Sequence, residues 1–411
     1  MDDTASGAPT GFPAGFWWGT AASSTQAEGA APASDWFAWE QARRAPRSGD
    51  GNGFATRYAE DFALYAEYGL THHRLSLEWA RLEPRPGHHD PEAVEHYRQV
   101  LTAARDAGIS TWVCLHHFTL PGWFSQDQGG FVDAANRIHW KRHVDWVAET
   151  FGDLVFGWKP INEPIAYALL GFRLGVHPPG LAEAEAYAEA LEAVHLANFE
   201  AWHLLRGGDQ PVATVHNLTP VHAATRSTNP HEATQAEDRA RQLDQGMWCW
   251  ARALREGVLE VPGRAPIETP DMAGAFDLIG FSYYFAQTVY ADGFGPYPAD
   301  AKVGPMGYAP WPEGLGVVLR RLADEVPGRP LLIDECGFGT DDDEWRTTLL
   351  SQSLEQVELA LADGLDIRGL FHWTGVDNYE WHRGFEVPFG CFTRDREPRG
   401  SAELLAAYAR A

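Results

Sequence analysis

The sequence has little of what marks secreted, metal-binding or nucleic-acid-binding proteins. Only four of its 411 residues are Cys, they lie far apart, and none forms a Cys-x-x-Cys pair. Neither a disulfide scaffold nor a zinc or dithiol site is therefore predicted. Basic residues are outnumbered, since 32 Lys and Arg face 57 Asp and Glu and the formal charge is −25. This charge repels nucleic-acid phosphate and anionic lipid, so neither is an expected partner.

Long apolar runs are also missing. The segment Met1–Phe16 is acidic, rich in Gly and Pro, and lacks the apolar core of a signal peptide. No other run approaches the length needed to span a membrane. We expect a cytoplasmic protein without a membrane anchor, and the sequence leaves the oligomeric state open.

Apolar and aromatic residues are abundant. The chain is 45% hydrophobic and 12% aromatic, with 17 Trp, so it can bury a sizeable core. No linker-like change in composition divides it. We expect residues 1–411 to form one domain, with a short flexible N-terminus over residues 1–11.

A repeated order of elements runs along the chain: an amphipathic helix, a glycine and a short apolar run. Pro91–Ala107, for example, has apolar residues at spacings of three and four, and Gly108 separates it from Ile109–Leu115. Eight β-like runs can be counted, with helical patterns between most of them: Phe16–Ser23, His73–Trp79, Ser110–His117, Phe156–Glu163, Pro211–Leu218, Phe276–Tyr284, Pro330–Glu335 and Ile367–Trp373.

Alternating strands and helices imply a parallel sheet covered by helices. Eight such units predict a single (β/α)₈ TIM barrel of class α/β, with long loops after the strands. A doubly wound open sheet is the alternative. It is disfavoured because no Gly-x-Gly-x-x-Gly turn follows a strand.

In a barrel the active site lies at the C-terminal ends of the strands, and polar residues gather there in this sequence. Two are carboxylates after different strands, Glu163 and Glu335. Glycosidic cleavage needs such a pair, one acid and one base or nucleophile. A carboxylate pair also binds Mg²⁺ or Ca²⁺, and an isolated Glu is often only a solvated loop residue. The chain has no His-Glu-x-x-His, EF-hand or Gly-x-Ser-x-Gly pattern, so neither a metal nor a Ser nucleophile is favoured.

Other residues at this rim have two interpretations. His116 and His117 end the third run and could be a structural pair or metal ligands. Trp123, Trp373 and Trp381 could belong to the core. They could also stack on a sugar ring, whose C–H face is apolar.

The chain resembles glycoside hydrolase family 1, the retaining β-glucosidases and β-galactosidases, from about Phe12 to Tyr408. Six motifs occur in the family's order, and together they are specific although each alone is weak. They are Phe12-Pro13-Ala14-Gly15-Phe16-Trp17-Trp18-Gly19 with Gln26-Ala27-Glu28-Gly29, His117 with Leu120-Pro121, Ile161-Asn162-Glu163-Pro164, Ile333-Asp334-Glu335-Cys336-Gly337, Asp377-Asn378-Tyr379-Glu380-Trp381, and Phe389-Gly390.

The resemblance implies a role for each matching position. Glu163 is the expected acid/base and Glu335 the expected nucleophile. Arg74 and Tyr284 are expected to contact Glu335 and keep it ionised, because a cation and a hydrogen-bond donor favour the carboxylate. The residues expected to bind the glycone are Gln26, His117, Asn162, Trp373 as its floor, Glu380 and Trp381. No metal or cofactor is expected.

The sequence departs from the family pattern beside these motifs. Ser282 stands where Asn is usual, Lys159-Pro160 replaces the usual Thr before the acid/base motif, and Asp334 and Cys336 flank the nucleophile where Thr and Asn are common. These differences affect the expected substrate range and rate more than the mechanism. Glu380 argues against 6-phosphorylated sugars, because a carboxylate repels a phosphate dianion.

The sequence therefore predicts a retaining β-glycosidase of β-glucosidase or β-galactosidase type, acting on β-O-glycosides through a covalent glycosyl-enzyme. One alternative is a transglycosidase, in which a sugar, lipid or small-molecule hydroxyl intercepts that intermediate. His116-His117-Phe118-Thr119-Leu120-Pro121 is similar to a branch of the family that includes a plant galactolipid-remodelling transferase. A catalytically silent sugar-binding protein is the other alternative, disfavoured by the presence of both carboxylates.

Overall fold

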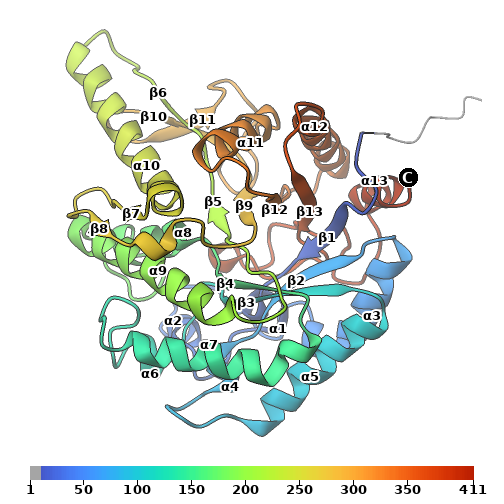
Figure 1. The fold of residues 1–411 in the computed structure, drawn as a ribbon. Coiled ribbons are helices and arrows are strands. Elements are labelled where there is room, and N and C mark those ends of the chain that lie inside the picture. The colour runs from blue at the N-terminus through green and yellow to red at the C-terminus, as the bar shows by residue number, and fades with distance from the viewer. Residues whose placement is uncertain (1–10) are drawn as a thin grey trace, which may run out of the picture.

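The fold is built on one sheet of eight parallel strands, which lies at the centre of Figure 1. The computed structural model describes residues 11–411. The spatial order of the strands is β4-β3-β2-β1-β13-β12-β9-β5. Their bounds are β1 Trp17–Ala21, β2 His72–Ser76, β3 Ser110–His116, β4 Gly157–Ile161, β5 His216–Asn217, β9 Ile279–Tyr283, β12 Leu331–Cys336 and β13 Ile367–Trp373. Each strand lies inside one of the eight runs expected from the sequence or extends beyond it by one residue at most.

The two ends of this sheet meet and close a barrel. Parallel bridges join Trp158 to Val212 and Asn162 to Val215, so the segment leading into β5 pairs with β4. The predicted (β/α)₈ barrel is thereby confirmed. The expected flexible segment over residues 1–11 lies almost wholly outside the described residues.

Helices surround the barrel, and most strands are followed by at least one of them (Figure 1). Their bounds are α1 Ser24–Glu28, α2 Asp35–Gln41, α3 Phe54–Glu67, α4 Trp79–Leu82, α5 Pro91–Asp106, α6 Gly122–Ser125, α7 Arg137–Phe151, α8 Pro164–Ala168, α9 Ala184–Leu205, α10 Pro230–Glu256, α11 Glu313–Glu325, α12 Asp343–Ala362 and α13 Gly400–Ala409. Short helical turns η1 Gly152–Leu154, η2 Leu169–Arg173, η3 Pro270–Met272 and η4 Trp381–Arg383 add to them. Two small sheets extend the loops: β6 Val221–Ala223 with β10 Ala286–Val289 and β11 Phe294–Tyr297, and β7 Val258–Leu259 with β8 Ile267–Glu268.

Helix α5 shows how local sequence sets these elements. The Asp90 carboxylate caps its first turn by accepting from the backbone N–H of Glu92 at 2.9 Å, and Pro91 occupies the first helical position. Its buried face includes Tyr97 and packs on the strands. Gly108 follows with φ of 77°, a left-handed conformation that glycine adopts without strain and that turns the chain into β3.

Two of the three buried apolar clusters among the described residues form the core of the barrel. The larger apolar cluster lies between strands and helices, and a smaller one fills the barrel itself. The inner cluster includes Trp112, Leu332 and Phe371, one each from β3, β12 and β13. Among the described residues, no helix is long and apolar enough to cross a membrane.

Candidate active site

The two candidate catalytic carboxylates lie at the C-terminal rim of the barrel. Glu163 is separated from the end of β4 by one residue, Asn162, and has a left-handed φ of 45° that L residues rarely adopt. Pro164 then begins α8. Glu335 lies near the end of β12. Both are buried, at 6% and 3% exposure, so neither is a solvated loop residue.

Two hydrogen-bond donors hold Glu335. Arg74, fully buried on β2, donates from Nη2 to Oε1 of Glu335. The Tyr284 hydroxyl, just after β9, donates to Oε2. Burial raises the pKa of Glu335, and the Arg74 cation and the Tyr284 hydrogen bond oppose that rise. The contacts expected for Arg74 and Tyr284 are both present.

Glu163 has a different environment. It accepts a hydrogen bond from a neutral amide, Asn217 Nδ2, at 3.3 Å. Burial, reinforced by the nearby negative charge of Glu335, raises the pKa of Glu163 to about 8. A carboxyl with that pKa still holds a proton at neutral pH and can donate it.

The expected glycone-binding residues surround the same rim. Asn162 accepts from Arg74 Nη1 through Oδ1 at 2.8 Å, while its Nδ2 has no partner among the described residues. Gln26 on α1 donates to the backbone oxygen of Tyr379 at 2.8 Å, which joins the N-terminal motif to the segment carrying Glu380. Both side chains are almost fully buried, but Gln26 Oε1 already accepts from the Ser23 hydroxyl at 2.8 Å. Of these two residues, only Asn162 therefore keeps a buried side-chain donor without a hydrogen-bond partner among the described residues.

Aromatic rings complete this rim. The His117 ring stacks on Trp373 at 5.6 Å between centroids and faces Trp381 at 6.3 Å, nearly parallel to both. The Trp373 indole N–H donates to Glu380 Oε1 at 3.3 Å, and burial raises the pKa of Glu380 well above its usual range. Flat apolar faces beside a buried carboxylate suit a ligand with C–H faces and many hydroxyls.

The neighbouring His116 lies outside this site. Its ring packs edge-on between Phe131 and Tyr167, and both nitrogens lack partners among the described residues. Trp123 also lies in the core, where its indole donates to the Glu83 backbone oxygen at 2.9 Å. No group of three or more His, Cys, Asp or Glu arranged to hold a metal ion occurs within residues 11–411.

Three residues were missed as site members by sequence reasoning. Asn217 could have been found, because it lies near the end of the fifth expected run, and the active site of a barrel lies at the C-terminal ends of its strands. Lys159 and Asp334 were noted only as departures from a motif. In the structure they form a buried ion pair in the barrel interior.

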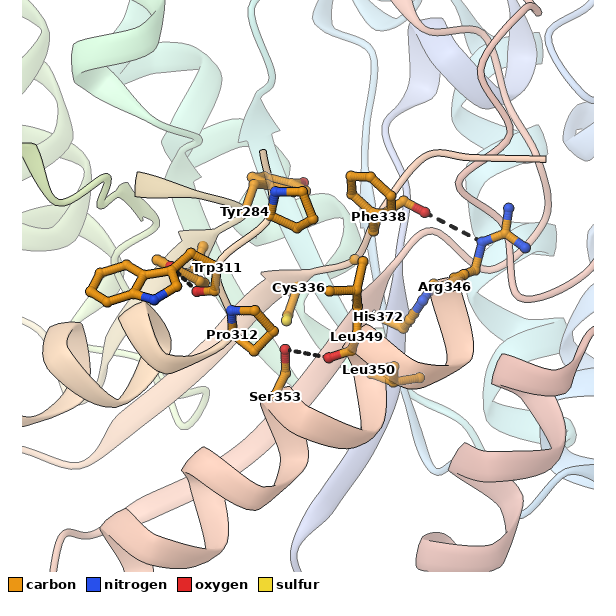
Figure 2. A pocket seen from close by; sticks show the side chains of 13 residues that line it. Tyr284, Trp311, Pro312, Cys336, Phe338, Arg346, Leu349, Leu350, Ser353 and His372 are labelled. Carbon is orange, nitrogen blue, oxygen red and sulfur yellow. Dashed lines mark hydrogen bonds between the residues drawn. The ribbon is translucent and has the colours of Figure 1, made fainter. Parts of the chain in front are cut away.

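A separate cavity lies beside β12 (Figure 2). Cys336 and Tyr284 line it together with Ser353 and Arg346 of α12. No carboxylate is among its lining residues, and the Arg346 guanidinium is already bonded to the backbone oxygen of Phe338. The cavity is therefore not the place where a glycoside would be cleaved.

Known proteins resemble this chain over nearly its whole length. A family model described as "Glycosyl hydrolase family 1" matches residues 8–406. Beta-glucosidase A of Thermotoga maritima is 26% identical over 92% of this chain and 92% of its own. The lactase/phlorizin hydrolase of Homo sapiens is 25% identical over 97% of this chain, but the chain spans only 24% of that protein's length. The structure of a beta-glycosidase from Pyrococcus horikoshii has a TM-score of 0.87, with 30% identity, 97% of this chain and 95% of that chain covered.

Proposed function

The chain belongs to glycosyl hydrolase family 1, a family of retaining β-glycosidases, and we propose that Glu335 is its nucleophile and Glu163 its general acid/base. The observation that carries this assignment is the unequal environment of the two carboxylates. Glu335 accepts from a guanidinium and a phenol, which favour its anion. Glu163 accepts from one neutral amide and has a pKa raised to about 8, which favours its acid.

The reaction proceeds in two displacements. An oxygen of Glu335 attacks the anomeric carbon of a β-glycoside, and the bond to the leaving oxygen breaks as Glu163 transfers its proton to that oxygen. The Glu163 carboxylate then takes a proton from water as the water attacks the anomeric carbon. The bond to Glu335 breaks, and the sugar leaves with its β configuration.

The glycone we propose is a neutral hexose of glucose or galactose type. Gln26, His117, Asn162 and Trp381 offer hydrogen-bonding groups to its hydroxyls, and Trp373 offers a flat face to the ring. Glu380 is a buried acceptor that would repel a 6-phosphate, so unphosphorylated sugars are the expected substrates. The residues at the site provide the acid, the nucleophile and the acceptors that this reaction uses, and the proposal includes no cofactor.

We further propose that the enzyme works in the cytoplasm. All four cysteines are free and buried in the structure, which suits a reducing compartment. The charge of −25 suits an enzyme whose partner is a neutral glycoside and not a nucleic acid.

Azide distinguishes the two carboxylates. Glu163→Ala keeps the nucleophile, so an aryl β-glycoside with an acidic phenol still forms the glycosyl-enzyme. Azide, which needs no general base, should then release a β-glycosyl azide. In Glu335→Ala no glycosyl-enzyme forms, and azide can only displace the phenol directly to give an α-glycosyl azide. NMR of the anomeric proton identifies each product.

The expected controls are wild-type enzyme with azide, which should yield mainly free sugar, and each variant without azide, which should be nearly inactive. If Glu163→Ala gave the α product and Glu335→Ala the β product, the two roles would be exchanged. If neither variant lost activity, the site would lie elsewhere.

A further inference from the structure

A buried ion pair crosses the barrel interior on the N-terminal side of the two carboxylates. Lys159 on β4 donates from Nζ to Oδ1 of Asp334 on β12, and both side chains are fully buried. The ammonium also lies 4.6 Å from the centroid of the Trp112 ring and 5.2 Å from that of Phe371. The pair therefore sits among the apolar rings that fill the barrel.

Asp334 links this pair to the nucleophile through Arg74. Its Oδ2 has no hydrogen-bond partner among the described residues and lies 3.6 Å from Nη1 of Arg74. The other terminal nitrogen of Arg74 donates to Glu335. One guanidinium thus contacts two consecutive carboxylates of one strand.

An irregularity in β12 makes that double contact possible. Side chains of consecutive strand residues normally point to opposite faces. Here the register of β12 shifts between Ile333 and Glu335 against β9, and between Ile333 and Cys336 against β13. Such a bulge re-aims side chains, and it brings Asp334 and Glu335 to the same guanidinium.

We propose that Lys159 and Asp334 are positioning residues for the reaction: together they hold Arg74 against Glu335 while adding no net charge beside the nucleophile. The proposal rests on the assignment of Glu335 as nucleophile. Asp334 gives Arg74 a second anchor, and Lys159 balances the charge that this anchor brings. Replacing either residue alone leaves one unbalanced charge next to the Arg74–Glu335 contact.

Stability alone does not account for the pair. Burying an ion pair costs desolvation that its attraction often fails to recover, and apolar residues of similar volume serve a core as well or better. The interior around Lys159 is already built from such residues, including Trp112, Leu332 and Phe371. A charge-balanced pair with one oxygen turned toward Arg74 is instead what orienting a guanidinium requires.

The acid limb of kcat/KM reports ionisation of the nucleophile in the free enzyme, so it senses this balance. Titratable or charged groups face Glu335 from five elements: Arg74 of β2, Glu163 after β4, Tyr284 after β9, Asp334 of β12 and Glu380 after β13. The variants below leave four of these unchanged.

The two single variants are expected to move the acid limb in opposite directions. Asp334→Asn removes a negative charge beside Glu335 and should move the limb to lower pH, by about half a pH unit or more. Lys159→Met leaves Asp334 unbalanced and should move it to higher pH by a similar amount. Each single variant should lower kcat/KM at the optimum pH by about tenfold or more. The double variant should recover about tenfold of that loss, and its acid limb should lie near the pH of the wild-type limb.

A second buried pair supplies the matched control. Arg396 donates to Asp61 at 2.7 Å, and both side chains are at most 5% exposed. Asp61→Asn should lower the melting temperature and leave the acid limb of kcat/KM unchanged. If one single variant of the proposed pair does not fold, as judged by circular dichroism, the other still tests the direction of its own shift.

The outcomes separate two failures. The positioning role would be overturned if the acid limbs of the single variants did not move, or if both moved in the same direction. It would also be overturned if the loss of kcat/KM in the double variant equalled the product of the two single losses. If Glu335→Ala remained active or gave the β-glycosyl azide, the assignment of the nucleophile itself would fail, whatever the pair does.

Discussion

Arg74 donates to Asn162 Oδ1 at 2.8 Å through one terminal nitrogen and to Glu335 through the other. A single guanidinium thereby fixes the proposed nucleophile relative to the residue that precedes the proposed acid/base. Because Asn162 Oδ1 faces Arg74, its Nδ2 points away from Arg74, where none of residues 11–411 accepts its hydrogen bond. In the proposed mechanism, this one side chain couples sugar binding by Asn162 to the geometry of the nucleophile.

Arg74→Lys is expected to lower kcat/KM by on the order of a hundredfold. A lysine ammonium keeps the charge but cannot make both contacts in the plane that the guanidinium provides. Steady-state kinetics on an aryl β-glycoside measure the loss. Arg98→Lys, at a surface pair with Asp153 in which both side chains are more than one-third exposed, is the control and should stay within about twofold. A loss of less than about threefold at Arg74 would show that charge alone suffices.

The basic limb of kcat/KM should lie near pH 8, where Glu163 loses its proton. Asn217→Ala removes the amide that donates to the Glu163 carboxylate and so favours its charged form. The pKa of Glu163 should rise further, and the basic limb should move to higher pH. A pH series of kcat/KM on both proteins measures this. A limb moving to lower pH would mean that Asn217 does not stabilise the carboxylate.

The barrel could be read from the sequence because each strand carries its own local signal. The run Ile367–Trp373 is bounded by Gly364 before it, and β13 has those same limits. The fifth run was the least regular: only His216–Asn217 forms a strand, and bridges at Val212 and Val215 complete it. The fifth run could still be recognised from the sequence, because its apolar composition reflects burial and does not depend on regular strand pairing.

The rim residues could be placed only to the level of their strand. His116 and His117 are adjacent, and pattern alone could not say that one enters the core beside Phe131 while the other stacks on Trp373. The pairing of Lys159 with Asp334 joins residues 175 positions apart and depends on a bulge in β12, for which no local sequence rule exists.

Glu380→Gln should lower kcat/KM by about ten- to a hundredfold, because the hydroxyl donors of a bound sugar favour the Glu380 carboxylate and a charged hydrogen-bond acceptor is worth roughly 1.5–3 kcal/mol. The amide keeps the size of the side chain and can still accept from the Trp373 indole, which is 3.3 Å from Oε1. The loss therefore reports the charge and not packing. Kinetics on a glucoside and a galactoside measure it, and wild-type values on both would remove Glu380 from the sugar site.

Removing the Glu163 carboxyl should stabilise the protein at high pH. Its pKa is raised from 4.5 to about 8 by burial and by Glu335, so the folded chain binds more protons than the unfolded chain between those values. Stability is thus lost as pH rises through this window, with a ceiling of about 5 kcal/mol. Glu163→Gln carries no such penalty and should melt at a higher temperature than wild type above about pH 8, with little difference near about pH 4.

Differential scanning calorimetry across this pH range measures the two melting temperatures. An exposed carboxylate supplies the control. Glu256 is 45% exposed, and hydrogen bonds from Arg252 and Arg255 lower its pKa. Glu256→Gln should therefore give no gain at high pH. If Glu163→Gln likewise gave none, the carboxyl would be ionised at no cost in the folded protein. The proton that the proposed mechanism delivers to the leaving oxygen would then have to come from another group, because a carboxylate already ionised at neutral pH has none to give.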